Sequence, residues 1–392
     1  MKRENLKPAT KAIHARSMGP RKNEPVAPPI YLSATFEASD VDEQVAIEKA
    51  HGDKFYTRYG NPTLTRTERT IAELEGAASA AVFASGMSAI TTTLLAHLQQ
   101  GDHAIFQREI YGGAHRFAYE MLPRYGVEVS WFNAESPDGF ESAIKDTTRV
   151  VYVESPTNPT LKLVDIERIA SSAKSKGIVS LIDSTFASPL NTRPHELGID
   201  GVLHSATKYL GGHSDLLAGA VAGTTAFIDR VKSFTRVLGG NLDPHASYLL
   251  TRGMQSLGLR MQRHNENALV VSRFLSGHDK VQAVHHPMLD SHPQHELAKR
   301  QMKGGGGVVS FEVKGGLEEA KRFSNAVSLF RVAPSLGGVE SLLSIPCLTS
   351  HAMLPPEERE KAGIRDGLVR LALGTEEPED LVADLEDALA AV

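Results

Sequence analysis

Residues 204–215 read His-Ser-Ala-Thr-Lys-Tyr-Leu-Gly-Gly-His-Ser-Asp. This stretch places Lys208 between small hydroxyl residues and a glycine pair, directly after the short apolar run 201–203. A lysine amine attacks a carbonyl only when it is neutral, which requires partial burial or a neighbouring positive charge. Ser205 and Thr207 could bond an anion beside it. The alternative is that Lys208 is one of 42 basic residues and is simply exposed to solvent.

A carboxylate follows another strand-like run upstream. Residues 179–182 are mostly apolar, and Asp183 follows them at the strand end where open α/β sheets bind ligands. Asp183 precedes Lys208 by 25 positions. Pyridoxal phosphate requires such a pair, because its aldehyde reacts with a lysine and its ring nitrogen pairs with a carboxylate. The alternative for Asp183 is a helix N-cap.

Composition limits the class of protein. The chain has 392 residues, a formal net charge of −5 and one cysteine, Cys347. This length predicts two or three domains, and the charge argues against a nucleic acid partner. A single cysteine excludes an intrachain disulfide framework and a cysteine-rich zinc site. The sequence shows no signal peptide and no apolar run of bilayer length, so we expect a cytoplasmic protein that does not enter a membrane.

Strand and helix patterns alternate along most of the chain, as is typical of a mostly parallel sheet covered by helices. Strands are predicted at 80–84, 103–106, 127–132, 150–153, 179–182, 201–203, 218–223 and 308–313, and helices at 63–74, 86–98, 114–124, 165–176 and 193–198. The first 50 residues are rich in proline and polar residues, with a strand-like piece at 30–36. Such an arm cannot form its own core, so we expect it to pack on another subunit or on the main domain.

Two turns could bind an anion. Tyr56 and Arg58 lie in the turn-rich segment 55–63, where an arginine fork could hold a phosphate; the alternative is an ordinary surface loop. Ser85-Gly86 separates a predicted strand from a predicted helix, and the free N–H groups of a helix start attract phosphate. It is not a P-loop, because no lysine follows at the required spacing. Many α/β turns have this pattern without binding anything.

Two more candidates follow predicted strands. Tyr111 precedes Gly112-Gly113 and could cover a flat cofactor, or could be a core aromatic residue at a tight turn. Asn158 lies after the strand at 150–153; its amide could reach the same ligand, or could bond its own backbone in a turn. The convergence of several such groups at strand ends is stronger support for a site than any one of them.

Six strings, in this order, give the chain a wider resemblance: Tyr-Gly-Asn-Pro-Thr (59–63), Ser-Gly-Met-Ser-Ala-Ile (85–90), Tyr-Gly-Gly (111–113), Glu-Ser-Pro-Thr-Asn-Pro (154–159), Ser-Ala-Thr-Lys-Tyr with Gly-His-Ser-Asp (205–215), and Ser-Leu-Gly-Gly-Val-Glu-Ser (335–341). They resemble the Cys/Met-metabolism family of pyridoxal phosphate enzymes, and the later stretches look most like cystathionine γ-synthases. The resemblance implies an aspartate-aminotransferase-like α/β fold (fold type I). It further implies an N-terminal arm (1–55), a large cofactor-binding domain (56–250), a smaller C-terminal α/β domain (251–392), and a homotetramer built of active dimers.

The resemblance also implies roles for single residues. Lys208 would hold the cofactor and move protons, Asp183 would pair with the ring nitrogen, and Tyr111 would stack on the ring as a second catalytic group. The residues expected to hold the phosphate are Gly86, Met87, Ser205 and Thr207, with Tyr56 and Arg58 reaching across from the neighbouring subunit. The residues expected to orient the substrate carboxylate are Asn158, Ser335 and Arg370.

Arg370 also stands out by chemistry alone. It interrupts the apolar run 368–373, where an unpaired charge would be costly; the alternative is an exposed strand residue. Two departures from the family pattern are Ser184, where many relatives have asparagine, and Gly113, where bacterial methionine γ-lyases usually have cysteine. Gly113 argues against that branch.

These parts predict a reaction on small amino acid substrates. We expect γ-replacement on an O-activated homoserine with cysteine, which forms cystathionine. The alternative is γ-elimination from cystathionine, methionine or another γ-substituted amino acid, since both reactions use the same residues. A cofactor-binding subunit without activity and an aminotransferase are further alternatives.

A metal site is not expected. The histidines at 285, 286, 292 and 295 cluster in the sequence, but their mixed spacing and the intervening prolines favour solvated loop histidines over metal ligands.

Overall fold

The computed structural model describes residues 6–14, 23, 25–352, 357, 359 and 362–392. Its strands are β1 Ser79–Phe83, β2 His103–Gln107, β3 Glu128–Phe132, β4 Thr148–Glu154, β5 Val179–Asp183, β6 Gly201–Ser205, β7 Gly219–Gly223, β8 Val281–His285, β9 Val308–Val313, β10 Arg331–Val332, β11 Leu342–Ser344 and β12 Leu368–Ala372. Its α-helices are α1 Pro8–His14, α2 Val41–Lys49, α3 Pro62–Glu75, α4 Gly86–His97, α5 Gly112–Arg116, α6 Pro137–Ser142, α7 Ile166–Ser175, α8 Ser188–Asn191, α9 Thr225–Leu238, α10 Pro244–Gln255, α11 Leu257–Ser276, α12 His295–Gln301, α13 Leu317–Ala326 and α15 Pro378–Ala390.

The larger sheet has seven strands in the order β1-β7-β6-β5-β4-β2-β3. Neighbours from β6 to β3 run parallel, whereas β7 is antiparallel to both β6 and β1. This confirms the predicted mostly parallel sheet covered by helices. Because β4, β5 and β6 run in the same direction, their carboxyl ends meet at one edge of the sheet.

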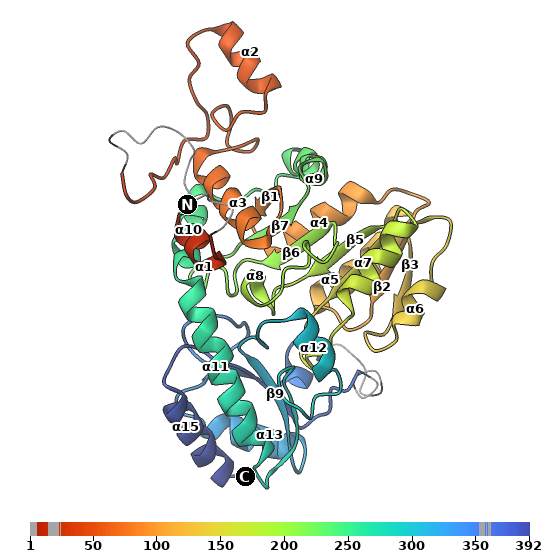
Figure 1. Cartoon of the computed structure of the whole chain (residues 1–392), viewed down its shortest axis with the longest axis vertical. Coiled ribbons are helices and arrows are strands. Elements are labelled where there is room, and N and C mark those ends of the chain that lie inside the picture. Colours follow the sequence, from red (N-terminus) through yellow and green to blue (C-terminus); the bar gives the residue numbers. More distant parts are fainter. Residues whose placement is uncertain (1–5, 15–22, 24, 353–356, 358, 360–361) are drawn as a thin grey trace.

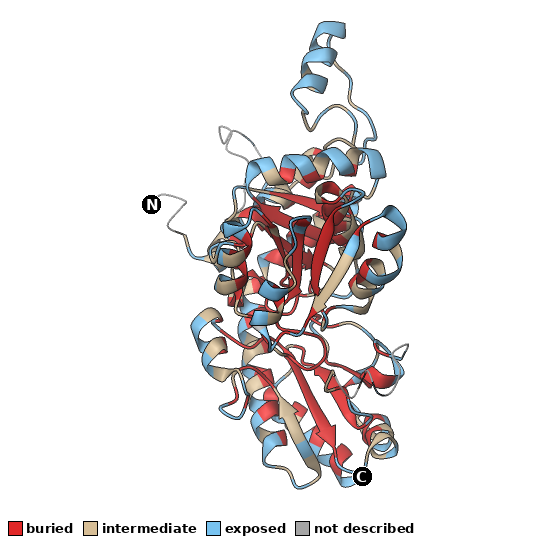
Figure 2. Ribbon diagram, turned by 90° about the vertical axis from the view of Figure 1, so that its right-hand side faces the viewer, coloured by how far each residue is buried: buried red, intermediate tan, exposed pale blue. Residues whose placement is uncertain are grey.

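The middle of this sheet is buried on both faces, as Figure 2 shows. Val150 and Tyr152 of β4 pack in the apolar cluster that includes α4 and α9, while Val151 and Val153 pack in the cluster that includes α7. Alternate side chains of a strand point to opposite faces. A parallel strand covered by helices on both sides therefore reads as the continuous apolar run seen in the sequence.

The second sheet has five strands in the order β10-β11-β12-β9-β8. It packs with α11, α13 and α15 around a separate apolar core. The long helix α11 extends from α1 and α10, beside the larger sheet, down to β8 and β9 (Figure 1). The two sheets lie on either side of residue 250 in the sequence. The boundary itself, which falls within α10, stays a prediction.

The arm divides into two parts. Helix α1 packs against α3, α10 and α11, whereas α2 has no buried residue and projects from the body in Figure 1. The strand predicted at 30–36 is wrong: only Thr35 forms a bridge, with Tyr56. Thr35 therefore ties the arm to the loop that carries Arg58.

Two helix predictions need correction. Residues 193–198 form hydrogen-bonded turns, since Gly198 adopts a left-handed φ of 99° that ends any helix there; the nearby helix is α8. The helix expected at 114–124 is present in three pieces, namely α5, a π-helical turn at Phe117–Met121 and a 3₁₀ turn at Leu122–Tyr125. Across the described ranges, none of the helices is both long and apolar enough to cross a bilayer.

A buried pair fastens β6, the strand that leads to Lys208. The His204 Nε2 atom lies 2.5 Å from Oε1 of Glu75 on α3, and the two side chains are 2% and 0% exposed. Replacing Glu75 by alanine should lower the free energy of unfolding by about 1–3 kcal/mol, because the buried imidazole loses its partner. Urea unfolding at fixed protein concentration measures the change. Arg116→Ala removes an exposed ion pair with Glu120 and should be nearly neutral; equal effects of the two variants would contradict a special role for the buried pair.

Candidate active site

A cavity of about 460 Å³ lies at the carboxyl ends of β4, β5 and β6. Its far wall comes from the C-terminal sheet, through β12 and the segment before β11. Ten residues predicted from sequence line it: Gly86, Met87, Tyr111, Asn158, Asp183, Ser205, Thr207, Lys208, Ser335 and Arg370. Tyr56 and Arg58, which were also predicted, do not line the cavity of their own chain.

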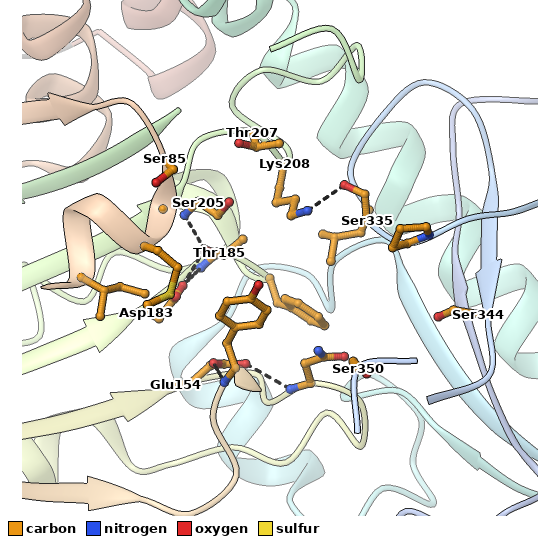
Figure 3. A pocket seen from close by; sticks show the side chains of 18 of the residues that line it. Ser85, Glu154, Asp183, Thr185, Ser205, Thr207, Lys208, Ser335, Ser344 and Ser350 are labelled. Carbon is orange, nitrogen blue, oxygen red and sulfur yellow. Dashed lines mark hydrogen bonds between the residues drawn. The ribbon is translucent and has the colours of Figure 1, made fainter. Parts of the chain in front are cut away.

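Lys208 points into the cavity and is not a solvated lysine. Its Nζ donates a hydrogen bond to Oγ of Ser335 at 2.7 Å (Figure 3). Burial, and next the positive charge of Arg370, lower the pKa of Lys208 from its ordinary 10.5 to about 8. Far more of this amine than of an ordinary lysine is therefore neutral near physiological pH, as a nucleophile or base requires.

Asp183 lies at the end of β5 and caps no helix, since the nearest helix, α8, begins at Ser188. Its Oδ1 accepts hydrogen bonds from the hydroxyl of Thr185 at 2.5 Å and from the N–H of Thr185 at 3.0 Å. Burial raises the pKa of Asp183, and the hydrogen bonds from Thr185 oppose that shift. The carboxyl group is thus held in one position beside the cavity.

The turn after β1 has the predicted geometry of an anion site. Helix α4 begins at Gly86, and its N-cap Ser85 accepts a hydrogen bond from Ser88 N–H. A Cβ at Gly86 would lie 3.0 Å from Cβ of Ser205, so the helix start and the end of β6 are in close contact. Thr207 bonds both the N–H and the carbonyl of Ala218, which fixes the turn that carries Lys208.

Arg370 on β12 connects the two sheets. Its Nη1 donates to Oδ1 of Asn158 and its Nη2 to the carbonyl of Ser335, each at 2.9 Å. The residue is 7% exposed, which excludes an exposed strand position, and burial lowers its pKa to about 10. Asn158 is buried and bonds Arg370 with its side chain rather than its own backbone. Ser335 has a φ of 100°, a conformation that a non-glycine residue keeps only where its surroundings enforce it.

Glu154 is a site residue that the sequence analysis did not select. It ends β4 and pairs in register with Asp183 across the sheet. Its Oε2 accepts from Tyr111 N–H at 2.6 Å and its Oε1 from Asn158 N–H at 3.1 Å. Burial and the charge of Asp183 hold the pKa of Glu154 well above its usual range. The available signal was its position: like Asp183, it is a carboxylate at the end of an apolar strand.

Tyr111 lines the cavity with a half-exposed side chain, 47% accessible, so it is not a core aromatic residue. Tyr56 and Arg58 lie elsewhere. Arg58 stacks over the rings of Tyr56 and Tyr59 and donates to the carbonyl of Arg236. It lines a second cavity between the arm and α9.

The histidines at 285–295 are not all solvated. His286 and His292 are 0% and 6% exposed, and burial lowers the pKa of each to about 4. This corrects the expectation of solvated loop histidines, because His286 packs against Gly305 and His292 lies beside the backbone of Leu161. Among the described residues, no group of three or more histidine, cysteine or acidic side chains is arranged to hold a metal ion.

The residues present fit pyridoxal phosphate. A lysine with a lowered pKa and a buried carboxylate face one cavity, and the lack of a Cβ at Gly86 lets the start of α4 pack against Ser205 beside that cavity. Lys208 could bind the aldehyde, Asp183 could pair with the ring nitrogen, and the N–H groups at the start of α4 could hold the phosphate.

Comparisons with known proteins agree with this fit. The family described as "Cys/Met metabolism PLP-dependent enzyme" matches residues 9–390. L-methionine gamma-lyase of Pseudomonas putida is 41% identical over 98% of this chain and 97% of its own. Cystathionine gamma-synthase 1, chloroplastic, of Arabidopsis thaliana is 42% identical over 92% of this chain and 64% of its own. The crystal structure of cystathionine gamma-lyase from Lactobacillus plantarum complexed with L-serine superposes with a TM-score of 0.93 at 37% identity, covering 99% of each chain.

The lowered pKa of Lys208 can be tested in protein freed of cofactor. Labelling of Lys208 by an amine-reactive reagent, followed by peptide mass spectrometry, should reach half its maximal rate near pH 8, because the neutral amine is the reactive form. In Arg370→Gln the midpoint should move to higher pH, since a positive charge that disfavours protonation is gone. A wild-type midpoint near 10.5 would contradict the burial of this amine.

Proposed function

Because the chain belongs to the Cys/Met-metabolism family of pyridoxal phosphate-dependent enzymes, we propose that it catalyses γ-elimination on a sulfur amino acid such as methionine or cystathionine. With water, the products would be a thiol, ammonia and 2-oxobutanoate. The observation that carries the proposal is the position of Lys208, 2.7 Å from Ser335 in the cavity that also holds Arg370 and Asp183.

The substrate carboxylate would bind at Arg370 and Asn158. Ser335 contacts both Lys208, through its hydroxyl, and Arg370, through its carbonyl. A carboxylate held at Arg370 would therefore place the adjoining α-carbon near the Lys208 amine. Proximity of this kind accounts for much of an enzyme's rate enhancement.

Lys208 would act as the proton carrier. Pyridoxal phosphate, when bound, supplies an electron-accepting ring that stabilises negative charge at the substrate α-carbon. An amine with a pKa of about 8 can accept a proton at neutral pH and return it, as general acid–base catalysis requires. Asp183 would keep the ring nitrogen protonated, and Tyr111 would cover the ring.

The lining of the cavity supports a γ-substituent bound through sulfur. Of the described residues that line it, the charged ones are Glu154, Asp183, Lys208 and Arg370, and each has a partner or role already assigned. The remaining wall includes apolar residues: Met87, Ile90, Phe186, Leu217, Pro334 and Leu336. Such a wall suits the uncharged thioether of methionine better than the carboxylate of a succinyl ester.

Elimination is preferred over the replacement expected from sequence because several relatives that are 40–42% identical along nearly the whole chain are named lyases. They include methionine γ-lyases, and the expectation that Gly113 argues against that branch stays a prediction. γ-Replacement with cysteine is the second candidate, supported by the likeness to a plant cystathionine γ-synthase.

The reaction can be decided by its products. The purified holoenzyme should form 2-oxobutanoate from methionine or cystathionine without any added thiol, and Lys208→Ala should reduce this rate by at least about 10³-fold, because the proton carrier is lost. Mass spectrometry identifies the products. If only O-acetyl- or O-succinyl-homoserine with cysteine is consumed, and cystathionine forms, the enzyme is a γ-synthase.

We also propose that the active unit is a dimer within a homotetramer, in which Tyr56 and Arg58 hold the cofactor phosphate of the partner subunit. Their separation from the cavity of their own chain supports this. Arg58→Ala and Lys208→Ala proteins should each be nearly inactive alone, but on subunit exchange hybrid dimers would contain one intact site. The mixture should recover up to about a quarter of wild-type activity. If Arg58 acted within its own chain, mixing would restore nothing.

A further inference from the structure

Glu154 contacts both the segment proposed to cover the cofactor and the loop proposed to bind the substrate carboxylate. One of its oxygens accepts from the N–H of Tyr111 at 2.6 Å and the other from the N–H of Asn158 at 3.1 Å. Tyr111 lies directly before α5, at its N-cap position, and Asn158 belongs to the loop after β4. Figure 3 shows Glu154 on the floor of the cavity with both hydrogen bonds drawn. The two loops thus have a common anchor.

The anchor is itself rigid. Glu154 is 4% exposed, its own N–H donates to Oε1 of Gln107 at 3.0 Å, and β4 pairs with β5 up to Glu154 and Asp183. Asn158 continues the connection, because its Oδ1 accepts from Arg370 Nη1. A displacement of Glu154 would therefore reach both the tyrosine ring and the arginine.

We propose that Glu154 is a positioning residue that fixes Tyr111 over the cofactor and Asn158–Arg370 at the substrate carboxylate at the same time. This inference rests on the roles proposed above for these residues but not on which γ-reaction occurs. A carboxyl group is needed because both of its oxygens accept from backbone N–H groups. In Glu154→Gln, the amide NH₂ would face one of these N–H groups and could not accept from it.

The test uses the holoenzyme and two binding measurements. The first is the rate at which pyridoxal phosphate leaves the diluted protein, followed by absorbance. The second is the affinity for norleucine, an amino acid without a γ leaving group, measured from the change in cofactor absorbance. Glu154→Gln should raise the rate of cofactor loss and weaken norleucine binding, each by roughly tenfold, because the side chain must shift to separate its NH₂ from one backbone N–H, and it holds both loops. Neither measurement depends on γ-elimination, so failure of the proposed reaction and failure of this inference are distinguishable.

Glu109→Gln is the matched control. Glu109 also has a largely enclosed carboxylate, 8% exposed, which accepts a backbone N–H from Ala134 at 3.0 Å and pairs with Lys162 at 3.5 Å, but Ala134 does not line the cavity. This variant should leave both measurements within about twofold of wild type. If Glu109→Gln and Glu154→Gln have equal effects, the role of Glu154 is general stability and the inference fails.

Double-mutant cycles identify the route of the effect. Combined with Tyr111→Ala, Glu154→Gln should add little further loss of cofactor retention. Combined with Asn158→Ala, it should add little further loss of norleucine affinity. The reason is that the effects of substitutions at coupled residues do not add. Full additivity in both cycles would overturn the proposal. If Glu154→Gln does not accumulate as folded protein, Glu154→Asp is the second variant. It keeps the carboxyl group but moves it away from the two N–H groups, so cofactor retention and norleucine affinity should both fall. A loss in only one of the two measurements would refute the joint role.

Discussion

The buried guanidinium of Arg370 is the interaction on which the cavity depends. It extends from the C-terminal sheet, donates to Asn158 after a strand of the larger sheet, and donates to the backbone of Ser335. A charge with so little exposure is tolerated only where hydrogen-bond partners surround it. Its Nε has no partner among the described residues. The contact that joins the two sheets thus also has an unused donor, which agrees with the proposed binding of a carboxylate there.

Two carboxyl groups side by side repel each other when both are ionised. Glu154 and Asp183 are paired in register on neighbouring strands, but their partners are distinct. Asp183 receives the hydroxyl and N–H of Thr185, and Glu154 receives N–H groups from two loops. The sheet therefore supplies one carboxyl group for the proposed ring nitrogen and one for holding the loops.

The parts that could be predicted from sequence were those with a local cause. Asp183 and Lys208 follow short apolar runs, and parallel strands bring such positions to one edge. Glu154 was missed because its partners, Tyr111 and Asn158, are identified only when separate loops meet in space. Residues 193–198 were misassigned because one turn of helix and a tight turn have similar patterns. The burial of His286 and the left-handed backbone of Ser335 depend on tertiary packing, which no local pattern encodes.

Part of the apolar wall of the cavity lies on loops, apart from the strands that carry most of its charged groups. Glu154, Asp183 and Arg370 lie on strands, and Met87 and Ile90 on α4, whereas Leu217, Pro334 and Leu336 lie on loops. Loops accept substitutions more readily than buried strands do. A lineage could therefore exchange one leaving group for another by changing the wall alone, with the acid–base machinery inherited intact. Substitutions confined to such loops would let one ancestral fold give rise to enzymes that catalyse elimination and to enzymes that catalyse replacement.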